Sequence, residues 1–179
     1  MKKFLTVLLC VATVIACALP MAGCSLFVEK PETDLETAKE NLITAGYTIE
    51  TYYELTSISE IAEKSGIADY LEASKDDGDD EYEVVIMRFG NSNLAIAYYK
   101  ELKATRNAAI DYANAEIDYY EEFLDEYSDA ISSDRKESIQ EKLSDYKDEL
   151  EEYNDLLLGR SGEYVWYGQK EAIKATKGE

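Results

Sequence analysis

The chain of 179 residues has one dense run of possible metal ligands. Five acidic residues lie within six consecutive positions: Asp76, Asp77, Asp79, Asp80 and Glu81. Carboxylate oxygens are hard ligands that suit calcium. The run lacks the alternating ligand spacing and the closing glutamate of an EF-hand loop. A polar turn between two strands is therefore the simpler interpretation, and weak calcium binding at these five residues is the alternative.

Nucleophilic catalysis finds little support in the residue types. The chain has no histidine, so neither a serine nor a cysteine can be activated by an imidazole base. Ser161 lies in Gly-Arg-Ser-Gly and not in the Gly-x-Ser-x-Gly of a nucleophile elbow, so we interpret it as a turn residue. A pair of carboxylates could hydrolyse glycosides, but 38 acidic residues do not single out a pair. We therefore predict a protein that is not an enzyme and uses no cofactor.

Cys24 closes a segment with the anatomy of an export signal. Lys2 and Lys3 precede an apolar run over 4–19, and small residues stand directly before Cys24. The run Met21-Ala22-Gly23-Cys24 resembles the cleavage motif of bacterial lipoprotein precursors, with methionine in place of the usual leucine-like residue. The resemblance implies removal of residues 1–23 and acylation of Cys24, with palmitate-like chains that hold the protein on the extracytoplasmic face of the cell membrane.

Two other interpretations of the same segment stay open. Val14-Ile15-Ala16-Cys17 also places a small residue before a cysteine, although cleavage there would leave apolar residues at the new N-terminus. Residues 4–23 also approach the roughly 20 residues of a membrane-spanning helix, so an uncleaved anchor is the second alternative.

The charge balance bears on possible partners. Loss of residues 1–23 removes two of the 18 basic residues and no acidic residue. The remaining chain has 16 basic and 38 acidic residues, so its net charge is −22. A body of this charge repels phosphate backbones, so we expect no nucleic acid partner. Cys10 and Cys17 would leave with the signal, and Cys24 would then be the only cysteine.

Hydrophobic periodicity and turn residues predict an α+β head. Ser57-Ile58-Ser59-Glu60 has the spacing of a capping box, and so has Thr33-Asp34-Leu35-Glu36. We expect a tether over 24–33, a helix from there to Gly46, a strand over 47–53, a helix over 58–65, strands over 68–74 and 81–89, a helix from 92 onward, a turn over 159–162, a strand over 163–167 and a helix over 169–176. The order βαββαβ favours a ferredoxin-like sandwich made of residues 34–106 and 159–179.

Residues 107–158 carry heptad spacing in two halves. The first half runs from Ile110 to Ile131 and the second from Ile139 to Leu157. Ser132-Ser133-Asp134 lies between them, and Asp134 with Glu137 is a possible cap. This pattern predicts an antiparallel helical hairpin, a coiled-coil arm inserted in the head. The predicted layers, each with residue numbers that sum to 270, are Ile131–Ile139, Tyr127–Leu143, Leu124–Tyr146, Tyr120–Leu150, Ile117–Tyr153 and Ala113–Leu157.

The hairpin is strongly acidic. Residues 107–158 hold 17 acidic residues against Arg135, Lys136, Lys142 and Lys147, a net charge of −13. A solvated outer face is one interpretation, and a docking surface for a basic partner protein is the other. From these features we expect a membrane-anchored, non-catalytic protein that binds or positions a partner. A small-ligand or cation-binding module, such as a sensor or scavenger, is the alternative.

The C-terminal stretch carries one further resemblance. Residues 162–173, from Gly-Glu-Tyr-Val-Trp-Tyr-Gly through Gln-Lys-Glu-Ala-Ile, are similar to the ends of small uncharacterised lipoproteins from Gram-positive bacteria, where a threonine commonly stands in place of Gln169. The resemblance implies no activity.

Overall fold

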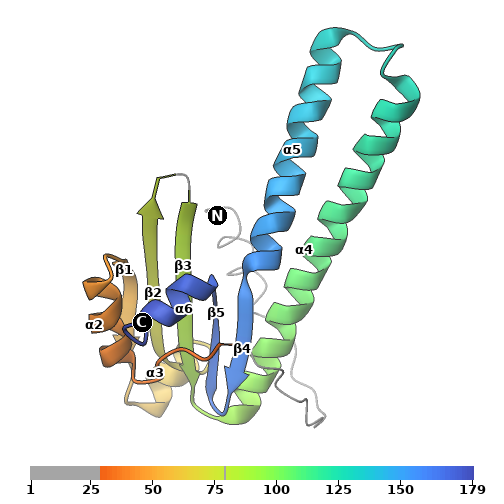
Figure 1. Ribbon diagram of the computed structural model, residues 1–179. Coiled ribbons are helices and arrows are strands. Elements are labelled where there is room, and N and C mark those ends of the chain that lie inside the picture. The colour runs from red at the N-terminus through yellow and green to blue at the C-terminus, as the bar shows by residue number, and fades with distance from the viewer. Residues whose placement is uncertain (1–28, 79) are drawn as a thin grey trace. The chain divides into compact units, whose positions relative to one another are not determined.

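The computed structural model describes residues 29–78 and 80–179, which form an α+β protein, as expected. The described part divides into two compact units, named here the head, with residues up to Leu102 together with Leu157–Glu179, and the hairpin unit, Lys103–Leu156. The elements in chain order (Figure 1) are α2 Leu35–Thr44, β1 Thr48–Glu54, α3 Ile58–Glu63, β2 Ile67–Asp77, β3 Asp80–Phe89, α4 Ser92–Tyr127, α5 Ser133–Asp155, β4 Leu157–Ser161, β5 Tyr164–Gly168 and α6 Lys170–Ala175.

The head contains one sheet of five strands in the order β1-β2-β3-β5-β4, and each neighbouring pair is antiparallel. Tight turns join two of the pairs. Gly78 has φ +76° where β2 turns into β3, and Gly162 has φ +58° where β4 turns into β5. Glycine adopts this left-handed conformation without a steric penalty, so both residues can form the turns that end these strands.

The strand order differs from that of the ferredoxin-like sandwich predicted from the sequence. A split βαβ unit needs two parallel strands joined by a helical crossover with another strand between them. Here β1 and β2 lie side by side and antiparallel, with Thr48 opposite Ser74 and Glu54 opposite Asp69. Helix α3 has only 6 residues, so the connection between these strands turns back on itself and does not cross over the sheet.

Strand β4 was not predicted. The sequence pattern places Leu157 in the helical seam and the rest of 156–158 in the hairpin, and it predicts a turn over 159–162. In the structure α5 ends at Asp155, and Leu157–Ser161 pairs with β5, with Gly159 opposite Trp166. A short apolar run fits a helix or a strand equally well when only its periodicity is considered. Leu157 therefore belongs to the sheet, and the predicted Ala113–Leu157 layer is wrong.

Helix starts follow capping chemistry. The capping box of Ser57 and Glu60 is confirmed, because each side chain bonds the other's backbone N–H. At α2 the cap is Asp34 and not Thr33: a carboxylate oxygen of Asp34 accepts a hydrogen bond from the Thr37 N–H at 2.9 Å. Both residue types cap helices well, and the chain uses the one directly before Leu35.

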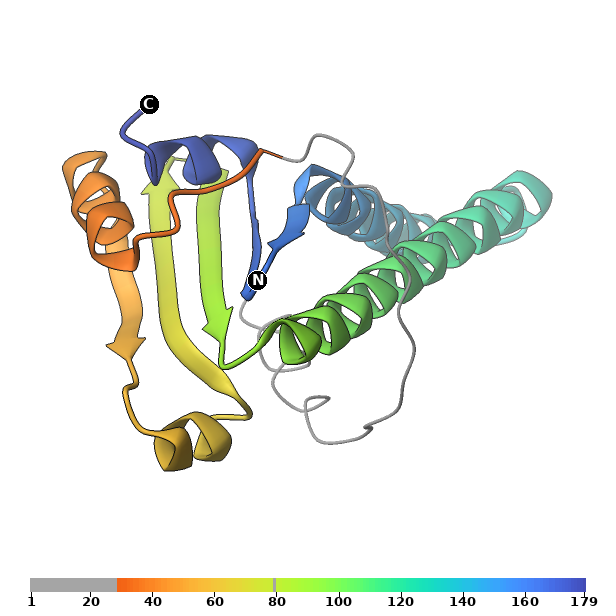
Figure 2. The ribbon, with the colours of Figure 1, turned by 90° about the horizontal axis from the view of Figure 1, so that it is seen from below.

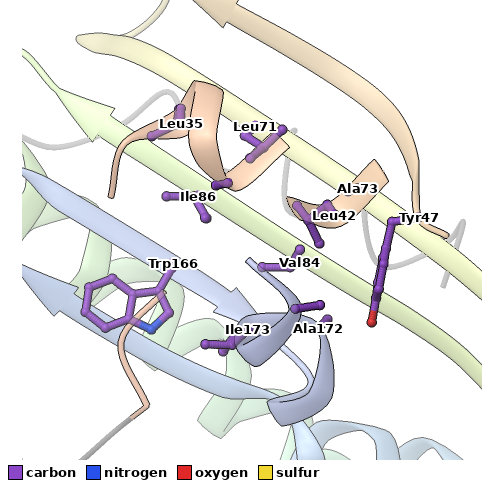
Figure 3. Close-up of a cluster of buried hydrophobic side chains, with 12 residues drawn as sticks. Leu35, Leu42, Tyr47, Leu71, Ala73, Val84, Ile86, Trp166, Ala172 and Ile173 are labelled. Carbon is purple, nitrogen blue, oxygen red and sulfur yellow. The ribbon is translucent and has the colours of Figure 1, made fainter. Parts of the chain in front are cut away.

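One face of the sheet is covered by α2 and α6 (Figures 2 and 3). The buried side chains between these layers are contributed by both helices, by β2, β3 and β5, and by Tyr47. They are Leu35, Ala38, Leu42, Tyr47, Leu71, Ala73, Val84, Ile86, Trp166, Ala172, Ile173 and Ala175. Burial of this apolar surface is the main force that holds the head together.

Helices α4 and α5 form the predicted antiparallel hairpin. Its most buried side chains, Ala113, Ile117 and Ile139, all occupy predicted seam positions. The register, however, is wrong by about two helical turns: the ring of Tyr146 lies 6.0 Å from the rings of both Tyr112 and Tyr120, so it is opposite the part of α4 between them and not opposite Leu124.

The register differs because the connection between the helices lies elsewhere than predicted. Helix α4 ends at Tyr127 and α5 begins at Ser133, with Ser132 as its N-cap, so the turn is centred earlier than the sequence pattern indicated. The predicted cap by Asp134 is also wrong, because Asp134 lies within the first turn of α5.

Candidate functional site

The predicted lipidation residue, Cys24, lies outside the described residues, as do the alternative Cys17 and the possible spanning segment 4–23. The described part starts at Glu29, inside the stretch predicted as a tether. Residues 29–33, named here the strap, run alongside α6 (Figure 2) and are bonded to the head at several points.

Glu29 fixes the first end of the strap. Its backbone carbonyl accepts a hydrogen bond from the Trp166 indole Nε1–H at 3.1 Å, and its carboxylate lies 2.5 Å from the Lys177 Nζ. The hydrogen bond from Lys177 lowers the pKa of Glu29, and the same bond raises the pKa of Lys177. Both groups therefore keep their charges through the neutral range, and the ion pair persists there.

Thr176 holds the other end of the strap. Its hydroxyl, in a residue with no exposed surface, accepts from the Glu32 N–H at 2.9 Å and donates to the Ile173 carbonyl at 2.6 Å. The Thr176 carbonyl accepts from the Asn41 side chain on α2 at 2.9 Å. Pro31 is buried between the two ends. Buried polar groups that lose a partner are costly, so this network fixes the strap to both helices.

Sequence reasoning missed the strap as a bound segment. The contact from Glu29 to Trp166 spans 137 positions, and short-range patterns carry no information about it. The single usable signal was Trp166 itself, because a buried indole N–H needs an acceptor.

The acidic run forms the end of the β2–β3 hairpin. Asp76 lies opposite Glu81 and Asp77 opposite Asp80, while Asp79 lies outside the described residues. Successive residues of a strand point to opposite faces, so Asp76 and Asp77 do not face the same side. In the part of the chain that the structure describes, no three acidic, histidine or cysteine residues gather as a metal site.

Calcium titration tests the alternative at this hairpin. We expect no change in melting temperature up to low millimolar calcium, because the carboxylates of Asp76 and Asp77 are divided between two faces. Differential scanning fluorimetry with magnesium as the control ion would measure this. A calcium-specific stabilisation that disappears in Asp76→Asn/Asp77→Asn would contradict the expectation and support the cation-binding alternative.

A second polar cluster, missed in the sequence, lies on the sheet face opposite α2 and α6. The Tyr70 hydroxyl donates to the Glu72 carboxylate at 3.2 Å. Burial raises the pKa of Glu83 to about 7, with further contributions from the negative charges of Glu72 and Glu81. Burial also raises the pKa of Tyr167 well above its ordinary value. The alternation in β3 was a usable signal, because it puts Glu83 in one row with apolar residues.

Asp69 and Arg88 form a further ion pair on neighbouring strands. Asp69 is 6% exposed, and its Oδ1 accepts no hydrogen bond within the described residues. The bond from Arg88 to Asp69 raises the pKa of Arg88, so the guanidinium stays charged. A buried carboxylate needs such a partner, and the pair neutralises charge within the sheet.

Comparison with models of protein families, with curated proteins and with solved structures gave no significant match. Within residues 29–78 and 80–179, no helix combines the length and hydropathy that a membrane span requires.

Proposed function

We propose that the protein is a non-catalytic lipoprotein, anchored through Cys24 on the extracytoplasmic face of the cell membrane, that positions a partner protein there. One observation carries the anchoring part of the proposal: the strap is bonded to the head from Glu29 onward, five positions after the cysteine of the signal motif. The signal and its cysteine precede the bonded part of the head, as a removable signal and an anchor require.

The surface of the hairpin unit supports the partner part of the proposal. Tyr112, Tyr119 and Tyr127 on α4 are 57%, 58% and 43% exposed. They lie among acidic residues, in a region with a net charge of −13 over 107–158. Tyrosine is enriched at protein interfaces, and a single-sign field steers a partner of opposite charge. A basic protein surface fits this combination of exposed rings and carboxylates.

Acylation of Cys24 is tested in cells that express the full chain with a labelled fatty acid. We expect the wild-type protein to incorporate the label and Cys24→Ser to incorporate none, because the thioether sulfur is lost. Cys17→Ser is the matched control and should retain the label. Loss of label in Cys17→Ser alone would assign the anchor to the alternative cysteine. No label in any variant would contradict the lipoprotein proposal.

A further inference from the structure

The strap sets a short limit on the distance between head and anchor. From Cys24 to Glu29 the chain has five residue steps, which span at most about 18 Å. The sequence alone had allowed a tether to residue 33, with a reach of about 30 Å. Because Glu29 is bonded to Trp166 and Lys177, the end of the head that carries α6 lies near the lipid-bearing residue.

This end of the head differs in charge from the rest of the protein. Residues 29–33 and 169–179 hold four lysines and four glutamates, so their net charge is zero. The other residues after position 23 hold 34 acidic and 12 basic residues, a net charge of −22. The strap and the C-terminal segment are therefore neutral in sum, whereas the rest of the protein is strongly acidic.

Two glutamates of these segments, Glu29 and Glu32, are bonded within the strap or to its neighbours, whereas two of the lysines are exposed. Glu29 pairs with Lys177, and the Glu32 carboxylate accepts hydrogen bonds from the backbone N–H groups of Thr33 and Asp34. Lys30 and Lys170 are exposed, and Lys174 is half-buried. Lys170 and Lys174 are four residues apart on α6 and so lie on one side of that helix, and Lys30 follows Glu29 in the strap. The hydrogen bond from Lys177 chiefly lowers the pKa of Glu29, and the positive charges of Lys174 and Lys170 lower it further. We name Lys30, Lys170 and Lys174 the lysine collar.

We propose that the lysine collar rests on the anionic headgroups of the bilayer and thereby fixes the orientation of the head on the membrane. This inference rests on the proposed lipid anchor at Cys24. Anionic headgroups attract lysines and repel carboxylates, and both effects act within a Debye length of about 8 Å at physiological salt. The short anchor holds the collar end of the head within about 18 Å of the lipid-bearing residue, so the collar can reach that range, while acidic surfaces of the head are repelled from the bilayer.

The protein carries its own reporter for this orientation. Trp166 is the only tryptophan in the chain, and its indole is bonded to the strap (Figure 3 shows its position in the core). Energy transfer from Trp166 to a dansyl-labelled lipid in the bilayer therefore measures how close the collar end lies to the membrane.

The experiment uses the chain from Cys24 to Glu179, coupled through its single thiol to a maleimide lipid in preformed vesicles. One set of vesicles is pure phosphatidylcholine, and the other contains phosphatidylglycerol, with equal dansyl content. We expect stronger transfer on the anionic vesicles at low salt and loss of this gain at high salt. Equal transfer on both vesicle types would overturn the inference.

Charge reversal then assigns the effect to the collar. Lys170→Glu/Lys174→Glu is expected to abolish the gain on anionic vesicles and leave transfer on neutral vesicles unchanged. Lys136→Glu/Lys142→Glu, in the hairpin unit, changes the net charge equally and should keep the gain. Equal losses in both double variants would mean that net charge and not the collar governs the orientation, and would overturn the inference.

Failure of this inference can be told apart from failure of the lipoprotein proposal. Chemical coupling supplies the anchor in the vesicles, so the result does not depend on whether cells acylate Cys24. Fatty acid label on Cys24 without a transfer gain would reject the collar alone. A transfer gain without label in cells would reject the lipid anchor while showing that the surface binds anionic lipid.

Discussion

Replacing Gly168 by alanine is expected to destabilise the head by roughly 2–6 kcal/mol, as the sum of backbone strain and overpacking. Gly168 ends β5, where it is paired with Val84 on one side and Leu157 on the other. Its φ is +154°, and a Cβ built there would lie 2.4 Å from the Glu83 carbonyl oxygen and 2.9 Å from the Val84 Cα. Both neighbours are backbone atoms of a central strand, so they cannot move aside.

Urea unfolding followed by Trp166 fluorescence measures this effect. Gly162→Ala is the matched control: its φ is also positive, at +58°, but nothing lies within 4 Å of the added methyl group. We expect the control to cost about 1–2 kcal/mol from backbone conformation alone. A Gly168→Ala midpoint equal to that of the control would show that the strand can shift to make room. Domains have free energies of unfolding of only about 5–15 kcal/mol, so the loss expected for Gly168→Ala is a substantial part of the stability of the head.

Local patterns predicted those parts of the fold that local physics determines. The apolar, β-branched run within Tyr82–Phe89, ended by the turn residues from Gly90, predicted β3. The spacing of Ser57 and Glu60 predicted the start of α3, because the two side chains bond each other's backbone. In both cases a few neighbouring residues contain the whole interaction.

The remainder depends on contacts between distant segments. Leu157 and Leu158 belong to a strand because their backbone pairs with β5. The three-residue apolar run that contains them does not predict this pairing, because it fits a helix or a strand. Ala113, Ile117 and Ile139 of the predicted hairpin seam are buried, whereas Tyr127 is exposed and Leu157 belongs to β4. The register was wrong, because heptad spacing tolerates a slip along the seam and the turn decides the pairing. The same limit applies to the strap, whose bonds join the beginning of the described chain to its end.

Because the pKa of Glu83 is raised in the folded head, the free energy of unfolding of the head should fall as the pH rises. In the unfolded chain this carboxyl has an ordinary pKa of 4.5, and in the folded head its pKa is about 7, because of burial and the nearby charges of Glu72 and Glu81. Between these values the folded state holds a proton that the unfolded state has lost. The free energy of unfolding therefore decreases with pH across this window, by about 1–3 kcal/mol after allowance for partial exposure.

Glu83→Gln should remove this dependence. The variant cannot ionise at this position, so we expect it to be about 1–3 kcal/mol more stable than the wild type at pH 8 and close to it at pH 5. Urea unfolding at half-unit steps between pH 5 and 8 measures the difference. Histidine, the side chain that ordinarily titrates in this range, is absent from the chain, which simplifies the assignment.

Glu40→Gln is the matched control, because Glu40 is exposed on α2. It should leave the slope of stability against pH unchanged. A wild-type stability that stays level or rises between pH 5 and 7.5 would show that Glu83 is already ionised at low cost in the folded head. Equal slopes for Glu83→Gln and the wild type would assign the pH dependence to another group. The expected result would show that the ionised Glu83 carboxylate lowers the stability of the head, because a neutral amide is better tolerated at this half-buried position.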